Sequence, residues 1–104
     1  TIMKEEPFGP LVPILSFKEF DEVIERANNN DLGLCSYICT NSMEQAHRAS
    51  ELMESGTVAV NTPVVAIAEA PFGGIKQTGY GREGGSMAIK DYLNVKYTHL
   101  GIKG

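Results

Sequence analysis

One stretch of sixteen residues, 70–85 (APFGGIKQTGYGREGG), constrains the fold of this chain most, because six of its residues are glycine. A glycine inside a helix costs about 1 kcal/mol relative to alanine, so we expect this run to form neither an ordinary helix nor an ordinary strand. Glycine instead suits backbone that turns sharply or passes close to another segment. We therefore expect residues 70–85 to form a tightly folded loop.

Part of this run has the pattern of a phosphate-binding loop. Residues 79–84 satisfy G-x-G-x-x-G, which in dinucleotide-binding folds follows a strand and precedes a helix. The preceding residues, 74–78, do not have the composition of a strand. The sequence therefore argues against a small dinucleotide-binding protein built on this loop.

Size and composition restrict the class of protein. The chain has 104 residues, 42% hydrophobic and 21% charged, which is ordinary for one small globular domain. Its net charge is −4 and its nine Lys and Arg residues are scattered, which argues against a nucleic-acid partner. No apolar run reaches the roughly 18 residues that cross a membrane, and no leader opens the chain. We expect a cytoplasmic protein with neither a nucleic-acid nor a membrane partner.

The chain has two cysteines, Cys35 and Cys39. Four residues apart on a strand, their side chains share a face but lie too far apart to form a disulfide. We expect both to be small buried apolar residues in a reducing compartment. His47 and His99 add no ligand grouping, so no metal site is expected.

Residues 11–61 alternate between strand-like and helix-like patterns. We expect strands at 11–16, 33–40 and 57–61, each followed or preceded by a helical apolar stripe. Strands and helices in this order form parallel sheets with helical crossovers. The prediction is an α/β fold with a β-α-β-α-β parallel-sheet core.

Helix starts are predicted from pairs with capping-box spacing. Ser16 with Glu19, and Asn41 with Glu44, place a side-chain acceptor three residues before a carboxylate. The asparagine triplet 28–30 is expected to end the first helix.

The remainder of the chain changes character after the third strand. Residues 62–69 have no helical period and are expected to be a loop. Ser86 is expected to cap a short helix over about 87–93, and residues 94–100 alternate as a strand with one buried face. With no later strand to pair with, that segment is a candidate for joining a sheet on another subunit.

Three motifs carry a resemblance to a known family. Residues 6–10 read E-x-F-G-P, Val60 and Asn61 close the third strand, and residues 71–83 read P-F-G-G-x-K-x-[ST]-G-x-G-R-E. On these motifs the chain resembles, over nearly its whole length, the C-terminal part of the aldehyde dehydrogenase superfamily. The residues at 75–79 and 92–97 are most similar to those of the succinate-semialdehyde branch.

The resemblance implies a division of the chain and a function. It implies one C-terminal fragment, 1–104, with a core at 11–61, a substrate loop and glycine-rich segment at 62–85, and a helix and oligomerisation strand at 86–104. Enzymes of this family use NAD or NADP to oxidise an aldehyde, here a small aldehyde or semialdehyde, to its carboxylate. They are homo-oligomers whose terminal strands exchange between subunits.

The resemblance also implies roles for single residues. Glu6 matches the glutamate that accepts hydrogen bonds from the nicotinamide ribose, and Phe8 the aromatic near the nicotinamide. Phe72 matches an aromatic of the aldehyde tunnel. A solvated carboxylate for Glu6, and ordinary core packing for Phe8 and Phe72, are the alternatives. Lys76 and Arg82 are interpreted as scaffold, buried charges paired with backbone or with other charged side chains around the loop.

Ala66 falls where the succinate-semialdehyde branch has a serine that contacts the distal carboxylate of the substrate. Because alanine cannot donate that hydrogen bond, a less polar aldehyde fits the sequence as well as a semialdehyde acid.

The family's nucleophilic cysteine and general base lie upstream of the Glu6 motif, and neither Cys35 nor Cys39 takes the nucleophile's position. We therefore expect no catalytic residue in this chain and no activity from it alone. The alternative is a stand-alone assembly module that pairs, through residues 94–100, with itself or with a complete enzyme.

Overall fold

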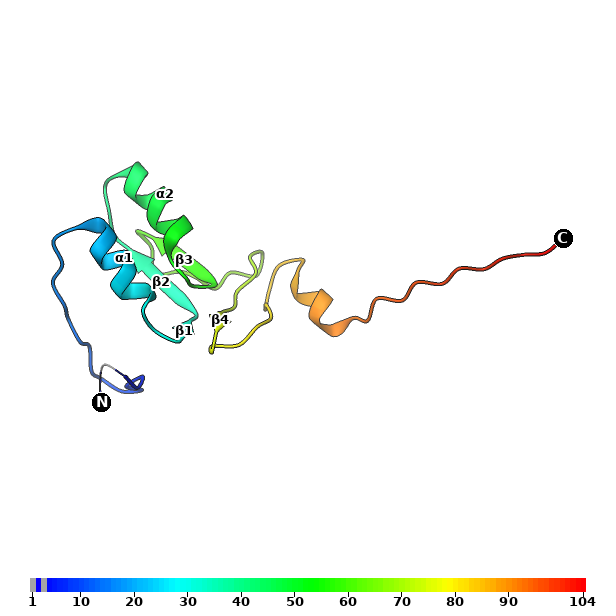
Figure 1. Ribbon diagram of the computed structural model, residues 1–104, viewed down its shortest axis with the longest axis horizontal. Helices are drawn as coiled ribbons and strands as arrows, with labels where there is room; N and C mark the ends of the chain where they lie inside the picture. The colour runs from blue at the N-terminus through cyan, green and yellow to red at the C-terminus, as the bar shows by residue number, and fades with distance from the viewer. Residues whose placement is uncertain (1, 3) are drawn as a thin grey trace.

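The computed structural model describes residue 2 and residues 4–104, and it has a folded part followed by an extended C-terminal tail (Figure 1). Its extents are 74 × 34 × 24 Å. The radius of gyration is 19.2 Å, against about 13 Å for a compact chain of this length, because the tail points away from the rest. The elements are α1 (Phe20–Asn28), β1 (Leu32–Gly33), β2 (Cys35–Ile38), α2 (Met43–Leu52), β3 (Thr57–Val60), β4 (Ile75–Lys76) and the 3-10 helix η1 (Ala88–Tyr92).

The centre of the fold is the parallel pair β2 and β3, joined through α2. Its register runs from Cys35 opposite Thr57 to Ile38 opposite Val60. Side chains of α1, α2 and β2 line one common hollow, so both helices lie against this pair. The buried apolar side chains of the described chain are Ala49 of α2, 2% exposed, and Ala59 of β3, 5% exposed. The α/β character and the third strand are therefore as predicted.

The first predicted strand is wrong for this structure. Residues 11–17 have no regular structure, and Val12 and Ile14 are 81% and 88% exposed. An isolated strand leaves its N–H and C=O groups without partners, so an apolar, extended sequence becomes a strand only beside another strand. No such neighbour occurs among the described residues, and the β-α-β-α-β core is reduced to one parallel pair.

The second predicted strand, 33–40, is divided. Leu32 and Gly33 form β1, which pairs antiparallel with β4 through Leu32 opposite Lys76 and Gly33 opposite Ile75. Residues 35–38 form β2 in the other sheet. The glycine-rich run therefore adds a short antiparallel strand at Ile75–Lys76, and the prediction of no strand in this run, including 74–78, is wrong there.

Two helix starts differ from the predicted ones. The N-cap of α1 is Glu19, whose side chain makes no capping hydrogen bond, and α2 is capped by Ser42, whose side chain accepts from the Gln45 N–H. Ser16 instead offers its carbonyl to Arg26 at 2.9 Å. In the first turn of α1, the Lys18 backbone N–H, and with it Arg26, lowers the pKa of Glu22 by bonding to its carboxylate. The end of α1 at Asn28 is as predicted.

The C-terminal helix is also different from the prediction. It is a 3-10 helix with Met87 at its N-cap and no side-chain cap, so Ser86 does not cap it. Residues 93–104 are extended and exposed, and they pair with no strand in the part of the chain that the structure covers. The predicted strand at 94–100 is thus absent from the isolated chain, for the same reason as the strand at 11–16.

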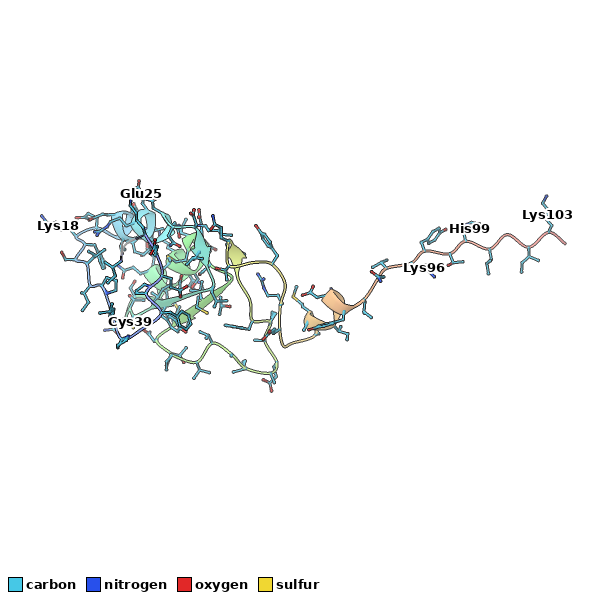
Figure 2. The ribbon with its side chains drawn as sticks, turned by 90° about the horizontal axis from the view of Figure 1, so that it is seen from below. Lys18, Glu25, Cys39, Lys96, His99 and Lys103 are labelled. Atoms are coloured by element: carbon cyan, nitrogen blue, oxygen red, sulfur yellow. The ribbon has the colours of Figure 1, made fainter. Side chains whose placement is uncertain are left out.

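Neither cysteine is fully buried: Cys35 is half-buried and Cys39 is exposed, and both are free thiols. The expectation of two buried cysteines is therefore wrong: Cys35 begins β2, Cys39 follows its last residue, and neither end of the strand is fully covered. Figure 2 shows Cys39 on the folded part, and Lys96, His99 and Lys103 along the extended tail. Within residue 2 and residues 4–104, no helix is long and apolar enough to span a bilayer, and no group of three side chains could hold a metal ion.

Candidate functional site

The glycine-rich run folds back on itself. Phe72 and Glu83 form an antiparallel bridge, in which the Phe72 N–H donates to Glu83 O at 2.7 Å and the Glu83 N–H to Phe72 O at 2.8 Å. Inside this loop, Arg82 Nη1 donates to the carbonyl oxygens of Gly74 at 2.9 Å and Gly81 at 2.7 Å. The run is the tight loop that its composition predicted, and Arg82 pairs with backbone as interpreted.

Polar contacts fasten this loop to the sheets. The Gly33 N–H donates to Thr78 Oγ1 at 2.8 Å, and Thr57 Oγ1 donates to Gly73 O at 3.3 Å. The Gln77 N–H donates to Asp31 O at 2.9 Å. The position of the loop is thus defined by both β1 and β3.

Lys76 contacts three residues outside the loop. Its Nζ donates to Asn28 O at 2.8 Å and Asn30 O at 3.0 Å, and it forms an ion pair with Glu54. The Asn28 side chain in turn donates to Leu52 O at 2.8 Å and accepts from the Glu54 N–H at 2.9 Å. One lysine therefore ties the loop to the end of α1 and to the connection between α2 and β3.

Phe72 borders a hollow of about 350 Å³ between the loop and η1. Its lining includes four residues that the sequence analysis did not predict as site residues: Leu34, Tyr80, Asp91 and Tyr92. Tyr80 and Tyr92 are 86% and 83% exposed. Tyr80 and Tyr92 lie in stretches that carry the family resemblance, but the resemblance implied no site role for them. The four residues come together from three segments of the chain.

Glu6 borders a different hollow. It is exposed and lines a space of about 310 Å³ with Leu34, Cys35 and Ser36 among its neighbours. Its carboxylate accepts no hydrogen bond from any residue that the structure describes. Leu34, between β1 and β2, borders both hollows. The Glu6 and Phe72 sites are therefore neighbours that share one wall residue.

Phe8 and Ala66 lie outside both hollows. Phe8 is fully exposed, next to tight turns in which the Gly9 N–H donates to Pro7 O at 2.9 Å. Ala66 is exposed in the segment before the glycine-rich run, and that segment is held by the Gly85 N–H, which donates to Ala68 O at 2.8 Å. The structure thus brings together neither Glu6 with Phe8 in one hollow nor Phe72 with Ala66.

The part of the chain that carries this loop and the E-x-F-G-P turn is similar to known proteins. The family model described as "Aldehyde dehydrogenase family" matches residues 1–98. The chain belongs to the aldehyde dehydrogenase family. The match covers the E-x-F-G-P turn, the parallel pair and the glycine-rich run in one piece.

Curated members of this family give the scale of the likeness. A 3-sulfolactaldehyde dehydrogenase of Pseudomonas putida is 48% identical over 100 residues, which are 96% of this chain and 21% of that protein. The succinate-semialdehyde dehydrogenase [NADP(+)] of Escherichia coli is 43% identical over 101 residues, 97% of this chain and 21% of that protein. The chain therefore spans about a fifth of the length of these relatives.

Solved structures of this family share the fold. An aldehyde dehydrogenase of Bacillus cereus in complex with NAD+ matches 99% of this chain with a TM-score of 0.93 and 46% identity, over 21% of that chain. A succinate-semialdehyde dehydrogenase of Burkholderia pseudomallei matches 88% of this chain with a TM-score of 0.84 and 41% identity, over 19% of that chain. The α/β fold is that of this family. The expected cofactors, NAD or NADP, are those named for two of these relatives.

Proposed function

We propose that this chain is a C-terminal part of an NAD(P)-dependent aldehyde dehydrogenase that oxidises a small aldehyde or semialdehyde to its carboxylate. The observation that carries the proposal is the loop 71–83, which has the family motif and is held by Lys76 and Arg82 so that Phe72 borders a hollow. In this role Phe72 provides an apolar wall that keeps water from the reacting aldehyde. Ala66 lies outside the Phe72 hollow, and its methyl side chain offers a substrate no hydrogen-bond donor.

Glu6 is the proposed contact to the cofactor. NAD or NADP, when bound, accepts the hydride that leaves the aldehyde carbon. Glu6 fits a ribose because its carboxylate is exposed at a hollow, is unpaired among the described residues, and accepts two hydroxyl donors at once. Phe8, two residues on, would close over the nicotinamide end of the cofactor. The nucleophile and the general base come from outside these residues, so the chain alone is inactive.

A chimera tests this function. In the Escherichia coli succinate-semialdehyde dehydrogenase [NADP(+)], the 101 residues that match this chain would be replaced by it. We expect the chimera to reduce NADP+ in the presence of succinate semialdehyde, and the 104-residue chain alone to reduce none. A chimera without turnover, or turnover by the chain alone, would contradict the proposal.

Glu6→Ala in the chimera tests the cofactor role. Hydrogen bonds to a charged group contribute about 1.5–3 kcal/mol, so we expect kcat/KM for NADP+ to fall about 10- to 100-fold. Glu5→Ala, one residue away and also exposed, is the matched control and should leave kcat/KM within twofold. Equal losses in the two variants would point to a general structural effect and sink the ribose role.

The tail favours a second candidate function, an assembly module. Val95, Leu100 and Ile102 are 102%, 84% and 94% exposed on extended backbone with free N–H and C=O groups. Such a segment can add as a strand to the sheet edge of a second copy, which would form a homo-oligomer. Sedimentation of the chimera with and without residues 94–104 measures this. If both sediment alike, the tail does not assemble subunits.

A cytoplasmic location stays a prediction from composition.

A further inference from the structure

The C-terminal segment, residues 86–104, is fastened to the rest of the chain at one point. The Arg82 backbone N–H donates to Asp91 Oδ2 at 2.9 Å. Over the described residues, no other hydrogen bond or ion pair joins 86–104 to the remainder. Asp91 lies on η1, immediately before the extended tail. The direction in which the tail leaves the fold therefore depends on this contact.

The residue before Arg82 is shaped to receive the Asp91 carboxylate. Gly81 has φ of 117°, and a Cβ built on it would lie 3.1 Å from Asp91 Oδ2. Any other residue here would crowd the oxygen that accepts from Arg82 and would strain the backbone. The loop and η1 thus fit each other at two successive residues.

The same contact reaches the wall of the aldehyde hollow. Arg82 precedes Glu83, whose backbone makes both hydrogen bonds of the bridge to Phe72. The Arg82 side chain bonds to the Gly74 carbonyl on the other arm of the loop. Asp91 and Phe72 border the same hollow. A displacement of Arg82 therefore moves both arms of the loop that carries Phe72.

We infer that Asp91 is a positioning residue that couples the aldehyde wall to the tail. Its carboxylate fixes the Arg82 backbone, which holds Phe72 through Glu83, and at the same time it fixes where residues 93–104 leave the fold. Binding of the tail to a second copy and binding of aldehyde are then linked through one hydrogen bond. The inference rests on the proposed function, because it assigns Phe72 to the aldehyde wall.

The test uses Asp91→Ala, Asp91→Asn and Lys90→Ala in the chimera. The readouts are KM for succinate semialdehyde and amide hydrogen exchange of residues 80–84. We expect Asp91→Ala to speed exchange at Arg82 and to raise KM about 10-fold, within the usual range of coupling between sites. Asp91→Asn keeps an acceptor oxygen, so its KM and its exchange rate at Arg82 should stay close to those of the parent chimera. Lys90→Ala, the exposed neighbour on η1, should change neither.

Gly81→Ala perturbs the contact from the loop side, because its methyl group crowds Asp91 Oδ2 and its φ of 117° strains the backbone before Arg82. It should reproduce both changes. Should Asp91→Ala not fold, Asp91→Leu, which removes both acceptor oxygens but keeps a bulky side chain, takes its place. The inference would be overturned if Asp91→Ala left exchange at Arg82 unchanged, or if Asp91→Asn were as impaired as Asp91→Ala. An inactive parent chimera would instead overturn the proposed function, while exchange at Arg82 would still report on the contact with Asp91.

Discussion

Lys76 shows how much of the loop depends on a single side chain. Its backbone has φ of 56°, a left-handed conformation that costs a non-glycine residue about 1–3 kcal/mol. The side chain is only 24% exposed, and its ammonium lies at the carbonyl end of α1, where a cation is favoured. The contacts to Asn28, Asn30 and Glu54 offset the backbone strain.

Replacement of Lys76 by Met keeps the length of the side chain but removes its charge and donors. We expect the free energy of unfolding of the chimera to fall by about 2 kcal/mol, as for hydrogen bonds to charged groups. Urea unfolding measures it. Lys90→Met, at an exposed position without such contacts, should change it by less than about 0.5 kcal/mol. A Lys76→Met variant as stable as the parent would show that the three contacts contribute nothing.

Where a helix begins depends on which side chain reaches a free backbone N–H group of its first turn. Asn41 and Ser42 are both good capping residues, and the sequence spacing favours Asn41. In the structure Ser42 Oγ accepts from the Gln45 N–H at 3.3 Å, and the Thr40 hydroxyl donates to Gln45 Oε1 at 2.9 Å. The helix therefore begins one residue later than predicted.

Ser42→Ala and Asn41→Ala separate the two assignments. Loss of a capping serine costs about 1 kcal/mol, so Ser42→Ala should lower the free energy of unfolding of the chimera by about that amount. Asn41→Ala should be nearly neutral. Urea titrations of the two variants side by side provide the comparison. The reverse order would restore Asn41 as the cap.

For the whole molecule, the main feature is how little of its apolar surface is covered. Phe8, Ile14 and Val95 are 100%, 88% and 102% exposed, and over residue 2 and residues 4–104 the buried apolar side chains are the alanines Ala49 and Ala59. Large exposed apolar surfaces in soluble proteins mark contacts with other protein. The family relatives are about five times longer, since this chain spans 21% of them. The rest of such a protein is what we expect to cover these faces.

Binding of an apolar dye tests whether the rest of the enzyme covers these apolar faces. The isolated chain should bind an apolar dye such as ANS, or self-associate, because its faces stay open. At equal molar concentration, the chimera should show several-fold less dye fluorescence per chain. Fluorescence from the chimera equal to or above that from the isolated chain would mean that the remaining four-fifths of the enzyme leave these surfaces bare.

Local patterns in the sequence were sufficient for some features. The end of α1 at Asn28, the strand β3 and the loop at 70–85 follow from asparagine, β-branched residues and glycine, whose preferences act within a few residues. The family motif at 71–83 is local in the same sense. These signals depend on the backbone near each residue, so they can be recognised without knowledge of the rest of the fold.

Only the tertiary structure decided the features that depend on distant partners. Residues 11–16 have the composition of a strand but no neighbour to pair with, whereas Leu32 and Gly33 find one in the glycine-rich run. The Arg82 contact with Asp91 joins segments nine residues apart, and no pattern in either segment encodes it. Strand pairing and side-chain contacts of this kind depend on which segments meet in space, which a local preference for extended or turned backbone does not determine.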